Sequence, residues 1–390
     1  MSNPRCFSFS DGKRISLLFL LSISLFAWSP QNKAYGQDPG SPPAFHPGEV
    51  WPDTNGTAIN AHGGGILFHD GTYYWFGEHK LDGGAGDVAQ VGIHVYSSKD
   101  LYAWKDEGIA LAVSDDPKSD ITKGCIIERP KVLFNAKTGK FVMWFHLELK
   151  GHSYDAARAA VAVADSATGP YQYVISFRLN AGILPKNELQ GGDINTFHRD
   201  FKGGQMSRDM TLFQDDDGSA YTIYASEENQ TLQISKLSDD YLGSSGEYIR
   251  ILPGKANEAP AMFKHSGRYF LITSGTAGWK PCDARLATAD SIFGNWVAQG
   301  NPCQGTDEQK RLTFESQSTY VLPIAGKKDA FIFMADRWRA GNPLDKPGIA
   351  IDRRYVWLPI QWDGQGLPFL TWKESWSLDF FDSPDFPPRL

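Results

Sequence analysis

The stretch Asp70-Gly-Thr-Tyr-Tyr-Trp-Phe-Gly77 places a small turn directly before an alternating aromatic strand. Glycine after aspartate is typical of a tight hairpin, because glycine accepts positive φ without a steric penalty. The same arrangement recurs in Thr138-Gly-Lys-Phe-Val-Met-Trp-Phe145, Asp217-Gly-Ser-Ala-Tyr-Thr-Ile-Tyr224, Ser266-Gly-Arg-Tyr-Phe-Leu-Ile-Thr273 and, more weakly, Gly326-Lys-Lys-Asp-Ala-Phe-Ile-Phe333. Such a repeat predicts one structural unit that is used five times.

Further strands flank these hairpins. An apolar strand precedes each one, as in Gly65-Ile-Leu-Phe68, and four are followed by another strand and a turn, as at residues 92–97. Four strands per unit, repeated around the chain, are the pattern of a β-propeller. A β-sandwich is the alternative, but it gives no reason for the same hairpin to recur. We predict an all-β, five-bladed β-propeller that forms a single domain over residues 37–390.

Residues 1–36 have a different character. The basic pair Lys13 and Arg14 precedes the apolar stretch Ile15–Trp28, and small residues follow at positions 34 and 36. The apolar stretch is shorter than the about 20 residues that span a bilayer, and its order is that of a secretory signal peptide. We predict cleavage near residue 36, a secreted or periplasmic protein, and no membrane association after cleavage.

The charge of the chain restricts its partners. The net charge is −7, and removal of residues 1–36 takes away four basic groups and one acid, which leaves it near −10. An acidic surface argues against nucleic acid and against anionic membranes as partners. A neutral ligand is compatible with this charge. The 12 tryptophans suit sugar binding but also a packed β core, so they decide nothing alone.

Three cysteines remain after signal cleavage, which is an odd number for an oxidising compartment. Cys282 and Cys303 flank a hairpin-like stretch, and we predict that they form a disulfide. Cys125 is then the free thiol, which we interpret as a small buried hydrophobe rather than a catalytic nucleophile.

A polar residue lies about ten positions before each hairpin, where the innermost strand of each blade begins. These residues are His62, Glu128, Asp209, Glu258 and Gln317. The symmetry of a propeller brings the five side chains together at one end of the axis. Acids that are held close together have pKa values that move apart, which supplies one protonated and one ionised carboxyl group. Glycoside hydrolysis needs this combination of a proton donor and an opposing base.

At these residues the chain resembles the family 43 glycoside hydrolases, and most of all the branch that contains exo-β-1,3-galactanases. The matching stretches are Ile59-Asn-Ala-His-Gly-Gly-Gly65, Tyr73-Tyr-Trp-Phe-Gly-Glu78, Glu128-Arg-Pro-Lys131, Arg208-Asp-Met210, Tyr224-Ala-Ser-Glu-Glu-Asn229, Asn257-Glu-Ala-Pro260 and Ser316-Gln-Ser318. The resemblance covers essentially all of residues 37–390. It implies a polysaccharide or oligosaccharide substrate, an inverting mechanism and no required cofactor.

The resemblance also implies roles for individual residues. Glu258 matches the general acid, and Asp209 matches the acid that tunes its pKa and orients it. The first-blade aspartate that activates water in most of the family is absent, because the stretch reads Asn60-Ala-His62. In the galactanase branch a glutamine takes that place, and Gln317 matches it, with Glu128 also required. An amide is a very weak base, so Glu128 acting directly or through Gln317 stays open.

Further positions match groups that hold the sugar. Glu78, Arg129, Tyr154 and Asn229 match residues of the subsite next to the scissile bond, although each could equally serve a structural hydrogen bond. His62 is near the axis and is a substrate-binding candidate. Some members of the family hold calcium in the central channel, so a structural Ca²⁺ at His62 is left open, and no other metal site is predicted.

The resemblance therefore predicts an exo-acting enzyme that releases galactose from β-1,3-galactan, as found in arabinogalactan side chains. Galactofuranosidase and α-L-arabinofuranosidase activities are alternatives, because pyranose and furanose rings are distinguished by loops rather than by these motifs. A non-catalytic sugar-binding propeller is a further alternative, and it would bind ligand without cleaving a bond.

Overall fold

The part of the chain that the computed structural model describes comprises residues 42–81, 86–88, 90–278, 280–337, 353–383 and 386. The predicted signal segment lies outside these residues. Helices in the described part are short: α1 (Ile194–Asp200), α2 (Asp307–Arg311) and the 3₁₀ turns η1 (Gly86–Val88) and η3 (Leu378–Asp382). None of the described helices has the length and apolar character needed to cross a membrane.

Four antiparallel sheets of four strands follow one another along the chain. The first contains β1 (His62–His69), β2 (Thr72–Lys80), β3 (Gln90–Ser98) and β4 (Lys105–Ala112). The second contains β5 (Ile126–Asn135), β6 (Lys140–Glu148), β7 (Arg158–Ala164) and β8 (Gln172–Phe177). The third contains β9 (Met210–Gln214), β10 (Ala220–Ser226), β11 (Thr231–Leu237) and β12 (Ser244–Ile251). The fourth contains β13 (Asn257–His265), β14 (Arg268–Gly275), β15 (Ala284–Ala289) and β16 (Val297–Gly300).

The prediction of five blades is wrong, because the described residues form six sheets. The fifth sheet contains β18 (Ser316–Pro323), β19 (Phe331–Arg337) and β20 (Tyr355–Pro359), and the sixth contains β17 (Cys303–Gln304), β22 (Pro368–Thr371) and β21 (Gln361–Trp362). The repeat in the sequence reveals only sheets that contain one of the recurring hairpins. The sixth sheet instead combines β17 with β21 and β22, which lie more than 50 residues later in the chain. Its β17 pairs in parallel with β22, and such a pairing leaves no hairpin signature.

The predicted hairpin turns are confirmed. The glycines of the five quoted turns all have positive φ, between 68° and 81°: Gly71, Gly139, Gly218, Gly267 and Gly326. The strands on both sides of each turn pair with each other, as β1 pairs with β2 from His69 and Thr72 onward. Each turn therefore sets the register of its hairpin, which fixes the residues that stand opposite each other at the far end.

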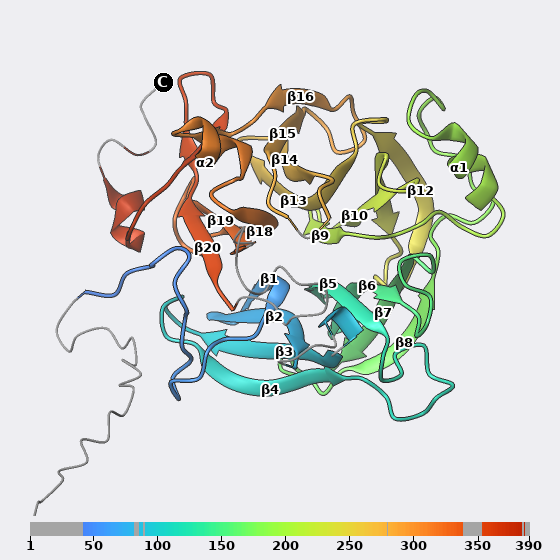
Figure 1. Cartoon of the computed structure of the whole chain (residues 1–390), viewed down its shortest axis with the longest axis horizontal. Helices are drawn as coiled ribbons and strands as arrows, with labels where there is room; N and C mark the ends of the chain where they lie inside the picture. Colours follow the sequence, from blue (N-terminus) through green and yellow to red (C-terminus); the bar gives the residue numbers. More distant parts are fainter. Residues whose placement is uncertain are drawn as a thin grey trace, which may run out of the picture. The chain divides into compact units, whose positions relative to one another are not determined.

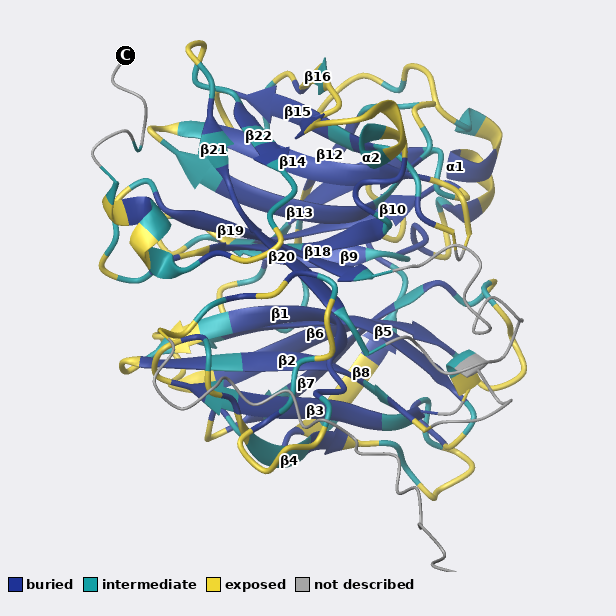
Figure 2. Cartoon of the chain, turned by 60° about the vertical axis from the view of Figure 1, so that its left-hand side comes forward, coloured by how far each residue is buried: buried dark blue, intermediate teal, exposed yellow. Residues whose placement is uncertain are grey.

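The sheets follow one another around a central axis, as the colour sequence in Figure 1 shows. The innermost strands β1, β5, β9, β13 and β18 contact each other in succession, and β18 closes the ring onto β1. Apolar clusters fill the spaces between neighbouring sheets, and most residues of the inner strands are buried, as the dark blue ribbons of Figure 2 show. Where the first sheet meets the fifth, the rings of Trp75 and Trp357 lie 4.9 Å apart.

The predicted disulfide between Cys282 and Cys303 is not formed, and Cys125 is free as well. Cys303 lies on β17 and packs in an apolar cluster with Phe314 and Leu370. Cys282 lies before β15, and its Sγ donates to the carbonyl oxygen of Gly275 at 3.2 Å. The stretch between the two cysteines is therefore not a simple hairpin, because its second end has left the fourth sheet for the sixth.

Candidate active site

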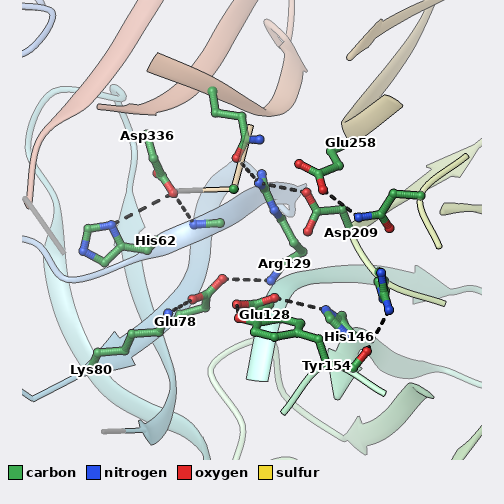
Figure 3. Close-up of a pocket in the computed structure, with 15 residues that line it drawn as sticks. His62, Glu78, Lys80, Glu128, Arg129, His146, Tyr154, Asp209, Glu258 and Asp336 are labelled. Atoms are coloured by element: carbon green, nitrogen blue, oxygen red, sulfur yellow. Dashed lines mark hydrogen bonds and ion pairs between the residues drawn. The ribbon is translucent and has the colours of Figure 1, made fainter. Parts of the chain in front are cut away.

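A cavity of about 210 Å³ opens where the innermost strands converge. Every residue for which the sequence predicted catalysis or sugar binding lines this cavity, as Figure 3 shows for most of them: His62, Glu78, Glu128, Arg129, Tyr154, Asp209, Asn229, Glu258 and Gln317. The remaining lining residues are Gly63, Lys80, His146, Arg208, Gly278 and Asp336. The fold thus gathers into one place polar groups from five sheets, and the most distant pair, His62 and Asp336, is 274 positions apart in sequence.

A β-bulge follows three of the axial residues. The pairing register shifts directly after His62, Glu128 and Glu258. The next residue in each strand has positive φ, with values of 59° at Gly63, 57° at Arg129 and 54° at Ala259. A bulge adds one residue to a strand and re-aims a side chain. Because two of these residues carry a side chain in the left-handed region, each costs about 1–2 kcal/mol.

The first wall of the cavity holds Glu258. Its Oε1 accepts a hydrogen bond of 2.6 Å from Nδ2 of Asn229, which ends a turn of three residues with positive φ between β10 and β11. Asp209 lies just before β9, and its Oδ2 accepts a hydrogen bond from the backbone N–H of Ala259. Burial, and then the charge of Asp209, raise the pKa of Glu258 to about 8. Glu258 therefore carries a proton at neutral pH.

The buried guanidinium of Arg129 connects the two sides of the cavity. Its NH2 donates to Oε1 of Gln317 at 2.5 Å and lies 3.1 Å from Oδ2 of Asp209, and its NH1 donates to the carbonyl oxygen of Ser318. Its backbone N–H donates to Oε1 of Glu78 at 3.0 Å. Burial alone would lower the pKa of Arg129, but the surrounding carboxylates raise it. Arg129 is thus a fixed cation at the centre of the site.

Gln317 is held at both ends of its amide. The oxygen accepts from Arg129, and Nε2 donates to Oγ of Ser274 at 2.9 Å. A cation bound to an amide oxygen draws electron density from it and makes it a weaker proton acceptor. The amide is therefore well placed to orient a neighbouring group but poorly suited to take a proton.

The second wall of the cavity holds Glu128. Its Oε1 accepts a hydrogen bond of 2.7 Å from the hydroxyl of Tyr154, and its Oε2 lies 3.1 Å from Nδ1 of His146. Burial would raise the pKa of Glu128, but His146, Lys80 and the Tyr154 hydrogen bond lower it to about 2. Glu128 is therefore ionised across the whole neutral range.

A carboxylate also lies behind His146. Nε2 of the imidazole is 2.8 Å from Oε1 of Glu148, and both oxygens of Glu148 accept from the backbone N–H of Ala157 at 3.0 Å. Burial lowers the pKa of His146, but the two carboxylates outweigh it and raise the value to about 9.

Glu78 lies beside a buried cation. Its Oε2 is 2.9 Å from Nζ of Lys80, which is also 2.9 Å from Oδ1 of Asp87. Burial raises the pKa of Glu78, against the opposing effect of Lys80. The two oxygens of Glu78 thus bind Lys80 and the Arg129 backbone, so Glu78 fixes the bulge next to Glu128.

His62 lies at the edge of the cavity near Asp336. Its Nδ1 is 4.0 Å from Oδ2 of Asp336 and has no hydrogen-bond partner among the described residues. Burial, and then the charges of Lys80 and Arg353, hold the pKa of His62 well below its ordinary value. Calcium requires six to eight oxygen ligands. Waters can supply part of such a shell, so the structural Ca²⁺ at His62 stays a prediction.

Two of the lining residues that the sequence analysis missed, His146 and Asp336, carry a recognisable signal. They stand directly opposite Glu128 and Gln317 in their hairpins. Glu78 stands opposite His62 in the same way. Counting across each hairpin from the axial residue would therefore have found them. Lys80 and Arg208 have no such register relation to an axial residue.

Comparison with known proteins places these observations in a family. The profile of the glycosyl hydrolases family 43 matches residues 65–368. A family 43 β-1,3-galactosidase solved with galactodeoxynojirimycin is 53% identical, with 86% of this chain and 100% of that chain covered and a TM-score of 0.79.

Two further proteins are similar to the chain. The exo-β-1,3-galactanase from Phanerochaete chrysosporium solved with galactose is 33% identical, with 86% of this chain and 68% of that chain covered and a TM-score of 0.70. A β-D-galactofuranosidase from Aspergillus niger is 28% identical over 129 residues, which are 30% of this chain and 37% of that protein.

Proposed function

We propose that this chain, which belongs to family 43 of the glycosyl hydrolases, releases galactose from the non-reducing end of β-1,3-galactan. The chain is a glycoside hydrolase. The observation that carries the substrate proposal is the 53% identity to a β-1,3-galactosidase over the whole of that chain. A cavity of about 210 Å³ with polar groups on its walls suits a single terminal sugar rather than the middle of a chain.

Glu258 acts as the general acid in this proposal. It carries a proton at neutral pH because burial and Asp209 disfavour its charged form. That proton passes to the glycosidic oxygen as the bond from this oxygen to the anomeric carbon breaks. Asn229 holds the carboxyl group in place, and Asp209 fixes the backbone beside it.

Water attacks the anomeric carbon from the opposite face, and the product has inverted configuration. We assign the acceptance of its proton to Glu128, because this carboxylate is ionised while the Gln317 oxygen is bound to Arg129. Gln317 then orients the water and Glu128 takes its proton. The two oxygens of Glu128 each have one donor, so each retains a lone pair for the water.

Release of galactofuranose is the second candidate, supported by the similarity to the Aspergillus niger β-D-galactofuranosidase. The test is to incubate the protein with β-1,3-linked galactooligosaccharides and with aryl β-galactopyranoside, β-galactofuranoside and α-L-arabinofuranoside. We expect galactose from the oligosaccharides, released one unit at a time and first seen by NMR as the α-anomer. Cleavage of a furanoside alone would contradict the galactan proposal, and binding without cleavage of any of them would contradict hydrolysis.

We also propose that the protein is exported, on the basis of the basic and apolar residues at its N-terminus. Expression of the full chain in a bacterium, followed by N-terminal sequencing of the product outside the cytoplasm, tests this. A product that begins near residue 37 is expected, and an uncleaved cytoplasmic chain would contradict the proposal.

A further inference from the structure

His146 and Glu148 form a buried pair next to Glu128, and neither residue has a role in the proposed reaction. Both residues are on β6, and their side chains are almost completely buried, at 1% and 0% exposure. A histidine in a protein core is ordinarily neutral, because burial disfavours its charge. Here each ring nitrogen lies within hydrogen-bond distance of a carboxylate oxygen.

The proton count on the ring follows from this geometry. An ionised carboxylate only accepts hydrogen bonds, and a neutral imidazole has a proton on one nitrogen alone. A neutral ring would therefore direct a lone pair at either Glu128 or Glu148. The arrangement is satisfied when both nitrogens are protonated, so that the ring donates once to each carboxylate.

Glu148 is in turn fixed by the backbone. Both of its oxygens accept from the N–H of Ala157, which has a left-handed φ of 44° just before β7. This contact orients Glu148, Glu148 orients the ring, and the ring reaches Oε2 of Glu128. The three side chains form a continuous chain of hydrogen bonds from the interior of the second sheet to the cavity.

We propose that His146 and Glu148 are positioning residues for the carboxylate that receives the proton of the attacking water: the doubly protonated ring keeps Glu128 ionised and directed into the cavity. The inference rests on the proposed function for the role of Glu128. It goes beyond that function by assigning the control of Glu128 to His146 in the cavity wall and to Glu148 behind it.

Other charged groups also face Glu128 and limit the size of the effect. Lys80 on β2 is a second cation nearby, and the Tyr154 hydroxyl donates to Oε1. Asp209 opposes them, because one of its carboxylate oxygens lies within 4.8 Å of an oxygen of Glu128 and a ring nitrogen of His146. The carboxyl groups of Glu78 and Glu258 also face Glu128 and oppose its ionisation. Loss of the imidazolium charge should therefore weaken the ionisation of Glu128 without abolishing it.

The first test is the replacement His146→Gln, with the carboxyl carbon of Glu128 followed by NMR in ¹³C-labelled protein. We expect the titration midpoint of Glu128 to rise by roughly 1–3 pH units, as for the loss of a neighbouring opposite charge. The acidic limb of galactoside hydrolysis should move upward by the same amount. A purely structural role would lower the rate without moving either midpoint, and that result would overturn the proposal.

The second test leaves the His146 side chain in place and does not depend on enzymatic activity. In the unchanged protein, ¹⁵N spectra of His146 should show both nitrogens protonated at pH 7.5, and a singly protonated ring would overturn the proposal. Glu148→Gln should lower the midpoint of His146. The matched control is Asp329→Asn, which alters a second histidine–carboxylate pair, with His265 at the far end of β13. It should leave His146 unchanged.

The hydrolysis assay and the NMR measurements together distinguish a failure of this inference from a failure of the proposed function. If the unchanged protein hydrolyses no galactoside, the proposed function is wrong, but both NMR measurements still report the protonation of His146 and Glu128. If hydrolysis is present and the Glu128 midpoint does not respond to His146→Gln, only the positioning role is wrong.

Discussion

The two walls of the cavity are built from the same backbone device but hold carboxyl groups in opposite states. Glu258 on β13 and Glu128 on β5 each lie near the start of an inner strand and are each followed by a bulge with positive φ. The groups around Glu258 are an anion, Asp209, the neutral amide of Asn229, and the cation Arg129, whose effect on the pKa of Glu258 burial and Asp209 outweigh. Around Glu128 they are an imidazolium and a phenol hydroxyl.

This difference shows that the position of a catalytic carboxyl group and its protonation state are determined by different parts of the structure. The repeated hairpin and bulge decide where a carboxyl group stands. The residues supplied by the second strands and by the connecting turns decide whether it holds a proton. Two glutamates in equivalent backbone positions can in this way serve as an acid with a pKa of about 8 and a base with a pKa of about 2.

The largest expected effect comes from Glu258→Gln, which keeps the shape of the side chain but removes its proton. Turnover of galactooligosaccharides should fall by ~10²–10⁴ with little change in binding. An aryl galactoside with a good leaving group should lose much less. Glu247→Gln, which changes an exposed glutamate on β12, is the matched control. Activity of Glu258→Gln within a few-fold of the parent would remove Glu258 from the role of acid.

The next largest loss of turnover is expected from changes to the water-activating residues Glu128 and Gln317. Glu128→Gln should lower turnover by orders of magnitude for every leaving group, because it removes the proton acceptor rather than the donor. Azide should restore part of the rate by replacing the activated water. Gln317→Ala should also be slow, since the water loses a positioning group. Near-full activity in both variants would show that another group activates the water.

Asp209→Asn should shift the pH dependence rather than only the rate. Activity needs protonated Glu258, so it should fall as the pH rises through about 8 in the unchanged enzyme. Without the neighbouring anion the pKa of Glu258 falls, and the alkaline limb should move to lower pH by roughly one unit or more. A limb that stays in place in kcat/KM profiles would show that Asp209 does not tune Glu258.

Asn229→Ala should have the smallest effect on the pH profile, and it should shift the alkaline limb in the direction opposite to the shift caused by Asp209→Asn. The amide of Asn229 donates to Oε1 of Glu258 and so favours the carboxylate form. Its loss should move the alkaline limb slightly to higher pH while the rate falls, because the acid is less firmly held. If the limb moved downward in both this variant and Asp209→Asn, the separate roles assigned to the two neighbours of Glu258 would be wrong.

The sequence was sufficient for the positions of the axial residues, because hairpin turns such as Asp70-Gly71 fix the register that the inner strands inherit. It was not sufficient for the sixth sheet, where Cys303 pairs with Leu370 far along the chain. For the same reason it misplaced Cys303 next to Cys282. Asp209, Asn229 and Tyr154 were named from the family resemblance, but His146 was missed, because its place beside Glu128 becomes visible only when the hairpin is paired.

A ¹³C titration of the carboxyl carbons in ¹³C-labelled protein without ligand measures the difference in pKa between the two glutamates directly. We expect one midpoint near 8 for Glu258 and one near 2 for Glu128, identified by the loss of each signal in Glu258→Gln and Glu128→Gln. Two midpoints close together near the ordinary value of about 4.3 would contradict it.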